Sequence, residues 1–108
     1  MDKPRKYYKG TYHHLYNRGA NKQNTFYERV NYTYFIEKMK LYKDKDKIDV
    51  LAYCLMPNHF HLFVIQRTNE YSISGFISSL LNSYTKSINK IYHKSGTLFE
   101  GKKRTGKL

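Results

Sequence analysis

The clearest apolar pattern in the chain spans Leu51 to Ile65, where two apolar runs meet at Met56-Pro57-Asn58. Proline cannot donate to a sheet ladder and asparagine tolerates unusual backbone angles, so this corner predicts the tight loop of a β-hairpin. The flanking runs, Ile48 to Leu55 and His59 to Ile65, are then expected to be paired central strands. Side chains alternate between the two faces of a strand. The expected faces of the second strand are His59, His61, Phe63 and Ile65 on one side, and Phe60, Leu62 and Val64 on the other.

Two further stretches place apolar residues at helical spacing and predict amphipathic helices. The first begins at Asn31, which suits an N-cap, runs to Tyr42 and ends in the charged stretch Lys43 to Lys47. The second covers Ile73 to Ile91, with Gly96 as its expected terminator. The two apolar stripes are Tyr32, Phe35, Ile36, Met39 and Tyr42, and then Ile73, Phe76, Ile77, Leu80, Leu81, Tyr84, Ile88 and Ile91.

Both ends of the chain contribute shorter patterns. Thr11 to Tyr16 is rich in strand-forming residues and predicts a first strand, with a turn at Asn17 to Asn21. His13 and His14 point to opposite faces of this strand, so at least one of them is expected to be ordinary packing or surface. Thr97 to Phe99 could begin a last short strand, followed by an irregular basic tail.

The resulting order, β-α-β-β-α with a possible final strand, predicts one α+β domain over residues 1–108. An antiparallel hairpin and two crossover helices favour a ferredoxin-like split β-α-β fold, an open antiparallel sheet with two helices on one face. The other face of the sheet should be free. The length of 108 residues allows one modest core and is too short for two domains.

The net charge of the chain indicates what kind of partner it binds. The 20 basic and 8 acidic residues give a formal charge of +12, which predicts a surface for nucleic acid or, less often, for an anionic membrane. No apolar run approaches the length of a membrane span, and the N-terminus MDKPRKYYKG lacks the apolar stretch of a signal peptide. We therefore expect a soluble, cytoplasmic protein with no membrane partner.

The first ten residues interleave basic and aromatic side chains, including Arg5, Lys6, Tyr8 and Lys9. Such a segment can neutralise phosphates and stack on unpaired bases, or it can be a solvated arm, and the pattern leaves both possibilities open.

The two histidines at the start of the hairpin's second strand have an ordinary and a chemical interpretation. Exposed faces of strands often carry polar residues by chance. Against that, His59 and His61 lie on one face, beside the proline corner of an otherwise apolar strand, in a strongly basic chain. A divalent ion held by two imidazoles and an oxygen ligand would polarise a phosphodiester, and a tyrosine could serve as the nucleophile. A rival is zinc with Cys54 as the third ligand, although this cysteine lies in an apolar run and is expected to be a buried thiol.

Four blocks of the sequence resemble the single-tyrosine HUH transposases, most closely the REP-associated tyrosine transposases. HUH denotes His, hydrophobe, His, and is represented here by His59-Phe60-His61. The resemblance covers nearly the whole chain. The blocks are YHHLYNRG at Tyr12 to Gly19, YCLMPNHFHLF at Tyr53 to Phe63, SYTKSINKIY at Ser83 to Tyr92 and SGTLFEGK at Ser95 to Lys102.

This resemblance implies a ferredoxin-like sheet, a homodimer, a Mg²⁺ or Mn²⁺ site on His59 and His61, and cutting of single-stranded DNA beside hairpins. In such enzymes a tyrosine attacks the phosphate, becomes joined to the DNA 5′ end through a phosphotyrosine and leaves a free 3′-OH. The nucleic-acid contacts that we expect are Arg5, Lys6, Tyr8, Lys9, Asn17, Arg18, Lys22, Lys102, Lys103 and Arg104.

The position of the nucleophile departs from the family pattern. In the family this tyrosine, and the remaining metal ligand, lie on a further helix beyond the segment that SGTLFEGK matches, and no tyrosine follows Tyr92 here. We expect a chain truncated before that helix. The other explanation is recruitment of an interior tyrosine, for which Tyr84 and Tyr92 are the candidates, although Tyr84 lies on an apolar helical stripe.

Three functions therefore compete. The leading one is single-stranded DNA binding with metal-dependent strand cleavage and joining, catalytically incomplete if the tyrosine is missing. The second is a noncatalytic module that binds single-stranded nucleic acid on the free sheet face. The third and weakest is a zinc-stabilised interaction domain.

Overall fold

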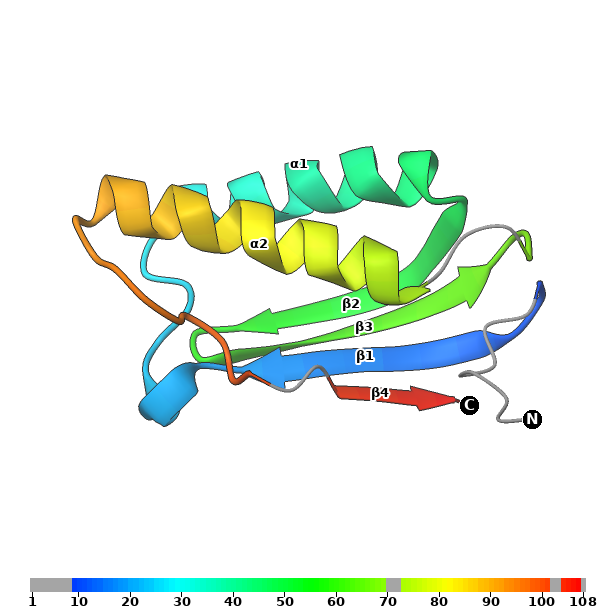
Figure 1. Cartoon of the computed structure of the whole chain (residues 1–108), viewed down its shortest axis with the longest axis horizontal. Coiled ribbons are helices and arrows are strands. Elements are labelled where there is room, and N and C mark those ends of the chain that lie inside the picture. Colours follow the sequence, from blue (N-terminus) through cyan, green and yellow to red (C-terminus); the bar gives the residue numbers. More distant parts are fainter. Residues whose placement is uncertain (1–8, 70–72, 102–103, 108) are drawn as a thin grey trace.

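The computed structural model describes residues 9–69, 73–101 and 104–107, which form one sheet covered on one side by two helices (Figure 1). The sheet has four antiparallel strands in the order β2-β3-β1-β4. This arrangement confirms the predicted α+β fold with both helices on one face. The elements are β1 (Tyr12–Arg18), the 3₁₀ turn η1 (Ala20–Lys22), α1 (Arg29–Lys45), β2 (Ile48–Met56), β3 (His59–Gln66), α2 (Ile73–Ile91) and β4 (Arg104–Lys107).

The predicted hairpin is formed by β2 and β3, with Pro57 and Asn58 as its turn. The carbonyl of Pro57 accepts hydrogen bonds from the backbone N–H groups of Thr25 and Phe26, at 2.7 and 3.0 Å, which tie the turn to the segment before α1. Of the two hairpin strands, only β3 is central, because β1 pairs with its other side. The expectation that both strands are central is wrong for β2, which is an edge strand among the described residues.

The strand β1 is longer than the sequence indicated. Asn17 and Arg18, which were expected in a turn, are still in the strand because they pair with Phe60 and His59 of β3. The chain turns only at Gly19, where a Cβ atom would lie 1.9 Å from the carbonyl oxygen of Gln23. A side chain does not fit there, so glycine is required by the close approach of the backbone.

The first helix extends a few residues beyond its predicted bounds at both ends, whereas the second covers the predicted Ile73–Ile91. Glu28, not Asn31, is the N-cap of α1, and Asn31 closes a capping box by accepting from the backbone N–H of Glu28 at 2.8 Å. The charged stretch after Tyr42 belongs largely to the helix. At the other helix, α2 ends at Ile91 and His93 adopts a left-handed backbone with φ of 54°, so Gly96 does not terminate it.

The last strand is not where the apolar residues predicted it. Leu98 and Phe99 are buried, but they join the core from an irregular segment, with one isolated bridge between Gly19 and Phe99. The strand β4 forms instead within the basic tail and pairs with β1. Leu98 and Phe99 are held in place by burial of their apolar side chains. The strand β4 forms where the edge of β1 offers backbone groups for pairing.

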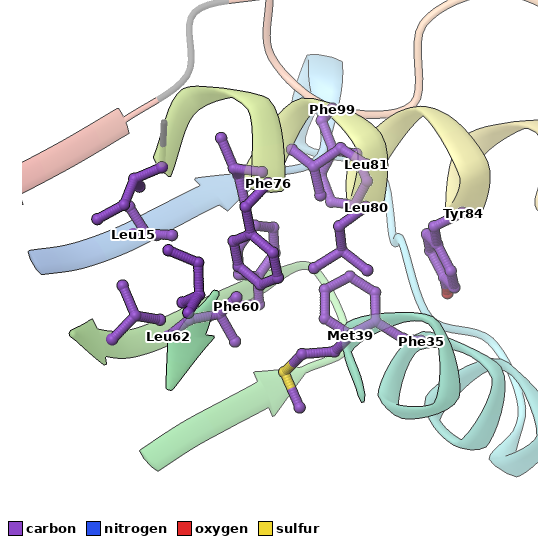
Figure 2. Packing of buried hydrophobic residues seen from close by; sticks show 14 of the residues in the cluster. Leu15, Phe35, Met39, Phe60, Leu62, Phe76, Leu80, Leu81, Tyr84 and Phe99 are labelled. Atoms are coloured by element: carbon purple, nitrogen blue, oxygen red, sulfur yellow. The ribbon is translucent and has the colours of Figure 1, made fainter. Parts of the chain in front are cut away.

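The core lies between the sheet and the two helices, as the packed side chains in Figure 2 show. Along β3 the burial alternates residue by residue, so Phe60, Leu62 and Val64 enter the core and the histidines face away from it. Cys54 was expected to be buried, but it is exposed on the edge strand β2. Among the described residues no helix is both long and apolar enough to cross a membrane.

Burial on the helical side of the sheet should dominate stability. Leu62 is 0% exposed and Leu51 is 56% exposed, and both are leucines in strands. We expect Leu62→Ala to lower the free energy of unfolding by about 2–5 kcal/mol, through lost burial and a cavity. Leu51→Ala should change it by no more than about 0.5 kcal/mol. Urea unfolding of both variants tests this, and equal losses would contradict the placement of the core.

Candidate metal and nucleic-acid site

The open face of the sheet carries a cluster of aromatic and imidazole rings from two strands. His59 and His61 stand on this face of β3, as the two-residue period predicts, with ring centroids 5.3 Å apart and planes at 86°. Their partners across the pairing with β1 are Arg18 and Tyr16. His14 follows on the same face of β1, opposite Phe63. The antiparallel register therefore brings together residues that are more than 40 positions apart in the sequence.

The two histidines of β3 have their Nδ1 atoms engaged by neighbours. Nδ1 of His59 lies 2.7 Å from Oδ1 of Asn58, the second residue of the hairpin turn. Nδ1 of His61 lies 2.7 Å from Nε2 of His14. In both rings Nε2 is therefore the nitrogen that remains for a ligand. Metal-binding histidines characteristically have their other ring nitrogen hydrogen-bonded in this way.

His14 belongs to this ring cluster, although the sequence did not mark it as part of the site. Its ring stacks on Tyr16 at 4.6 Å, on Phe63 at 4.7 Å and on His61 at 5.0 Å. Burial lowers the pKa of His14, and the neighbouring His61 lowers it further. Its place beside His61 follows from the pairing of β1 with β3, and the alternation of faces along one strand does not reveal that pairing.

A hollow of about 380 Å³ opens at the end of the sheet where this cluster lies. The guanidinium of Arg18 is anchored at its rim, because its Nε lies 2.6 Å from a carboxylate oxygen of Glu100. The side chain of Arg18 is nevertheless 59% exposed, so its other N–H donors face solvent. The residues that line the hollow are Tyr16, Asn17, Arg18, Asn58, His59, Phe60 and His61.

The donor set fits a divalent ion in part. Two imidazole Nε2 atoms on one face are a common pair of metal ligands. The described residues contain no group of three or more His, Cys, Asp or Glu side chains that could hold a metal ion. Cys54 pairs across the ladder with His61, but it forms no such group with the two histidines. The described part of the chain thus lacks the ligand set of a structural zinc site, which usually needs four.

The first candidate nucleophile, Tyr84, is not at this site. It lies on α2, on the helical side of the sheet, and is 0% exposed. Its hydroxyl donates to the backbone carbonyl of Thr25 at 2.6 Å, and burial raises its pKa. Figure 2 shows the ring packed among the core side chains. Tyr84 is therefore a core residue, and its burial on the helical side of the sheet argues against a role as the nucleophile.

The second candidate, Tyr92, lies just after α2 and contacts the start of α1. Its hydroxyl donates to the carboxylate of Glu28 and lies 3.3 Å from Oδ1 of Asn31. The hydrogen bond to Glu28 raises the pKa of this phenol. The tyrosine that lines the hollow with the two histidines is Tyr16, which the sequence did not single out.

The expected nucleic-acid contacts are placed unevenly. Arg18 lines the hollow, and Lys9 and Lys22 are exposed. Asn17 is 3% exposed, with its amide N–H directed to the carbonyl of Glu100 at 3.3 Å, so it supports the fold and offers little surface to a ligand. Arg104 begins β4. The remaining five, Arg5, Lys6, Tyr8, Lys102 and Lys103, lie outside the described residues.

Fold and site together define a class of protein: a four-stranded antiparallel α+β domain with two histidines on the open face of its sheet. The family described as Transposase IS200 like matches residues 6–104. This chain belongs to that family, which confirms the resemblance to the tyrosine transposases. No curated protein matches the sequence.

Two solved structures share the fold. One is described as a REP-associated tyrosine transposase bound to a REP hairpin, with a TM-score of 0.74 and 14% identity. The comparison covers all of this chain but only 62% of that protein. The other is a candidate transposase from Deinococcus radiodurans, with a TM-score of 0.73 and 17% identity, covering 100% of this chain and 86% of that one. At these identities the likeness shows the fold.

The environment of His14 has a consequence for its titration. Because its pKa is lowered on folding, the unfolded chain binds more protons in the window just below the ordinary histidine pKa. The stability that depends on uncharged His14 is present above that pKa and is lost as the pH falls through the window. We expect NMR titration to show the ring of His14 protonating below the ordinary value of about 6.5. Protonation at or above that value would contradict the packing described here.

Proposed function

We propose that this chain is a transposase domain that binds single-stranded or hairpin DNA on the open face of its sheet and holds Mg²⁺ or Mn²⁺ through His59 and His61. The observation that carries this proposal is the convergence of both imidazoles on one face, with Nδ1 of each ring engaged and Nε2 left for a ligand. A divalent ion held there would draw charge from a phosphodiester and stabilise its developing negative charge.

The side chains beside the two histidines are suited to binding a phosphate group. Arg18 stands across the ladder from His59, and Glu100 fixes its Nε while the exposed side chain keeps further N–H donors. The charge of +12 provides long-range attraction for a polyanion. One structure with the same fold is described as bound to a REP hairpin, which supports hairpin DNA as the partner. Because the match covers 62% of that protein, the DNA partner stays a proposal for this chain.

A second function, noncatalytic binding of single-stranded nucleic acid, is favoured by the tyrosines. Cleavage by this family's chemistry requires a phenol held in line with the bound phosphate. Tyr84 is in the core, and the hydroxyl of Tyr92 is engaged by Glu28. The hydroxyls of both candidate nucleophiles are thus engaged away from the histidine pair. The described residues therefore support nucleic-acid binding more clearly than strand cleavage.

Binding should be electrostatic and should depend on the end of the sheet where the hollow lies. The turn η1 lies at that end, where β1 stops and the hairpin turns (Figure 1). We expect the affinity for a hairpin oligonucleotide to fall steeply with salt, and Lys22→Ala to reduce the slope of log K against log salt by about 0.7–0.9. Lys40→Ala, an exposed lysine on α1, is the matched control and should leave the slope unchanged. Fluorescence anisotropy from low to moderate salt measures both, and a flat dependence would contradict phosphate binding.

Strand cleavage gives a separate test. We expect that the chain, incubated with Mn²⁺ and a labelled hairpin oligonucleotide, forms no covalent adduct through Tyr84 or Tyr92, because neither hydroxyl lies at the histidine pair. The assay is a denaturing gel with wild type, Tyr84→Phe, Tyr92→Phe and Tyr16→Phe, and with His59→Ala as the control for the metal site. A metal-dependent adduct that only Tyr84→Phe or Tyr92→Phe removes would overturn this placement.

A further inference from the structure

We propose that His14 is a positioning residue, which accepts a hydrogen bond from Nδ1–H of His61 and thereby holds that ring in the form whose Nε2 faces the metal. The inference rests on the metal site proposed above. It assigns a role to a residue on a different strand that is not itself a ligand.

The contact between the two rings is short and is fixed by packing. Nε2 of His14 lies 2.7 Å from Nδ1 of His61, a normal hydrogen-bond length, and the two ring planes are 17° apart. Tyr16 and Phe63 both stack on the His14 ring, the latter at only 6° from parallel. These neighbours restrict rotation of the His14 ring, so its Nε2 is presented in one place.

The chemistry of imidazole then fixes the direction of the hydrogen bond. A ring nitrogen that binds a metal uses its lone pair and carries no proton, so in a neutral ring the other nitrogen carries it. If Nε2 of His61 binds the ion, Nδ1 of His61 is the donor and Nε2 of His14 is the acceptor. Without an acceptor the ring could move its proton to Nε2, where it would block the metal.

The neighbouring ligand shows the same arrangement with a different acceptor. Nδ1 of His59 faces the amide oxygen of Asn58 at 2.7 Å, and an amide oxygen can only accept. Thus the turn of the hairpin orients one histidine, and the adjacent strand orients the other. Since Nε2 of His14 is already occupied by His61, His14 serves as a support and not as a third ligand.

A purely structural role for His14 is the competing explanation, and the variants are chosen to separate the two. His14→Phe keeps an aromatic ring for the stack and removes the acceptor. His14→Gln removes the ring but places an amide oxygen about as far along the side chain as Nε2. His13→Phe is the matched control, since His13 lies one position earlier on β1, faces the helices and is 2% exposed.

Two measurements on the full chain test the proposal. In the metal-free protein, ¹⁵N chemical shifts of the His61 ring should show the proton on Nδ1 in wild type, His14→Gln and His13→Phe, and a shift of population to Nε2 in His14→Phe. In Mn²⁺ titrations followed by water proton relaxation, His14→Phe should weaken binding about 10- to 100-fold. His14→Gln should recover most of that loss, and His13→Phe should bind as wild type does.

Each other outcome overturns the proposal. If metal-free wild type carries the His61 proton on Nε2, His14 does not orient the ring, whatever the variants do. If His14→Phe and His14→Gln weaken Mn²⁺ binding equally while the His61 proton stays on Nδ1, His14 acts through packing alone. Failure of the proposed metal site is detected separately with His61→Ala. If that variant binds Mn²⁺ as wild type does, the metal site is wrong, while the ¹⁵N shifts of the His61 ring in wild type still show whether His14 orients that ring.

Discussion

The antiparallel pairing of β1 with β3 is the interaction on which the rest of this structure depends. It places β3 in the interior of the sheet and sets opposite each other the residues of two distant segments, Arg18 with His59 and Tyr16 with His61. The same register directs Leu15 and Leu62 into the core. A slip of one residue would exchange the two faces of a strand, so packing of the core and assembly of the site are enforced together.

Because both helices pack on one side of the sheet, its two faces differ in composition and in role. The covered face is apolar and supplies stability, and it holds Tyr84 with its hydroxyl satisfied by Thr25. The open face carries the imidazoles of His59 and His61 and the phenol of Tyr16. Burying such polar groups in the core is costly unless they find hydrogen-bond partners there, as Tyr84 does. The two candidate ligands therefore lie at one end of the sheet, beside a turn that the Pro57 carbonyl ties to the segment before α1. Such support restricts the positions of His59 and His61.

The open face also shows how support for the site is distributed. Each of the two candidate ligands is held by a residue outside the pair, Asn58 for His59 and His14 for His61. Glu100 does the same for Arg18 from the segment that leads toward β4. The charged and imidazole groups of the hollow are thus held by three different parts of the chain, and its geometry is a property of the whole fold.

The sequence by itself determined the features that follow from local rules. The proline corner specified the hairpin turn, the two-residue period put His59 and His61 on one face, and the apolar stripe of α2 marked Tyr84 as core. The family, too, is evident from short motifs, because these residues are read directly from the chain. These features depend on backbone geometry and on side-chain alternation over a few residues, so no distant contact is needed to predict them.

Only the tertiary structure decided which segments meet. It made β2 an edge strand and exposed Cys54, moved the last strand to β4, and buried Asn17. It also brought His14 to His61 and kept Tyr92 with Glu28. Strand order and register arise from the summed burial of many side chains and from the pairing of backbone groups across the whole sheet. The residue pattern of one segment contains no information on these contributions from distant segments, so it does not reveal which residues become neighbours.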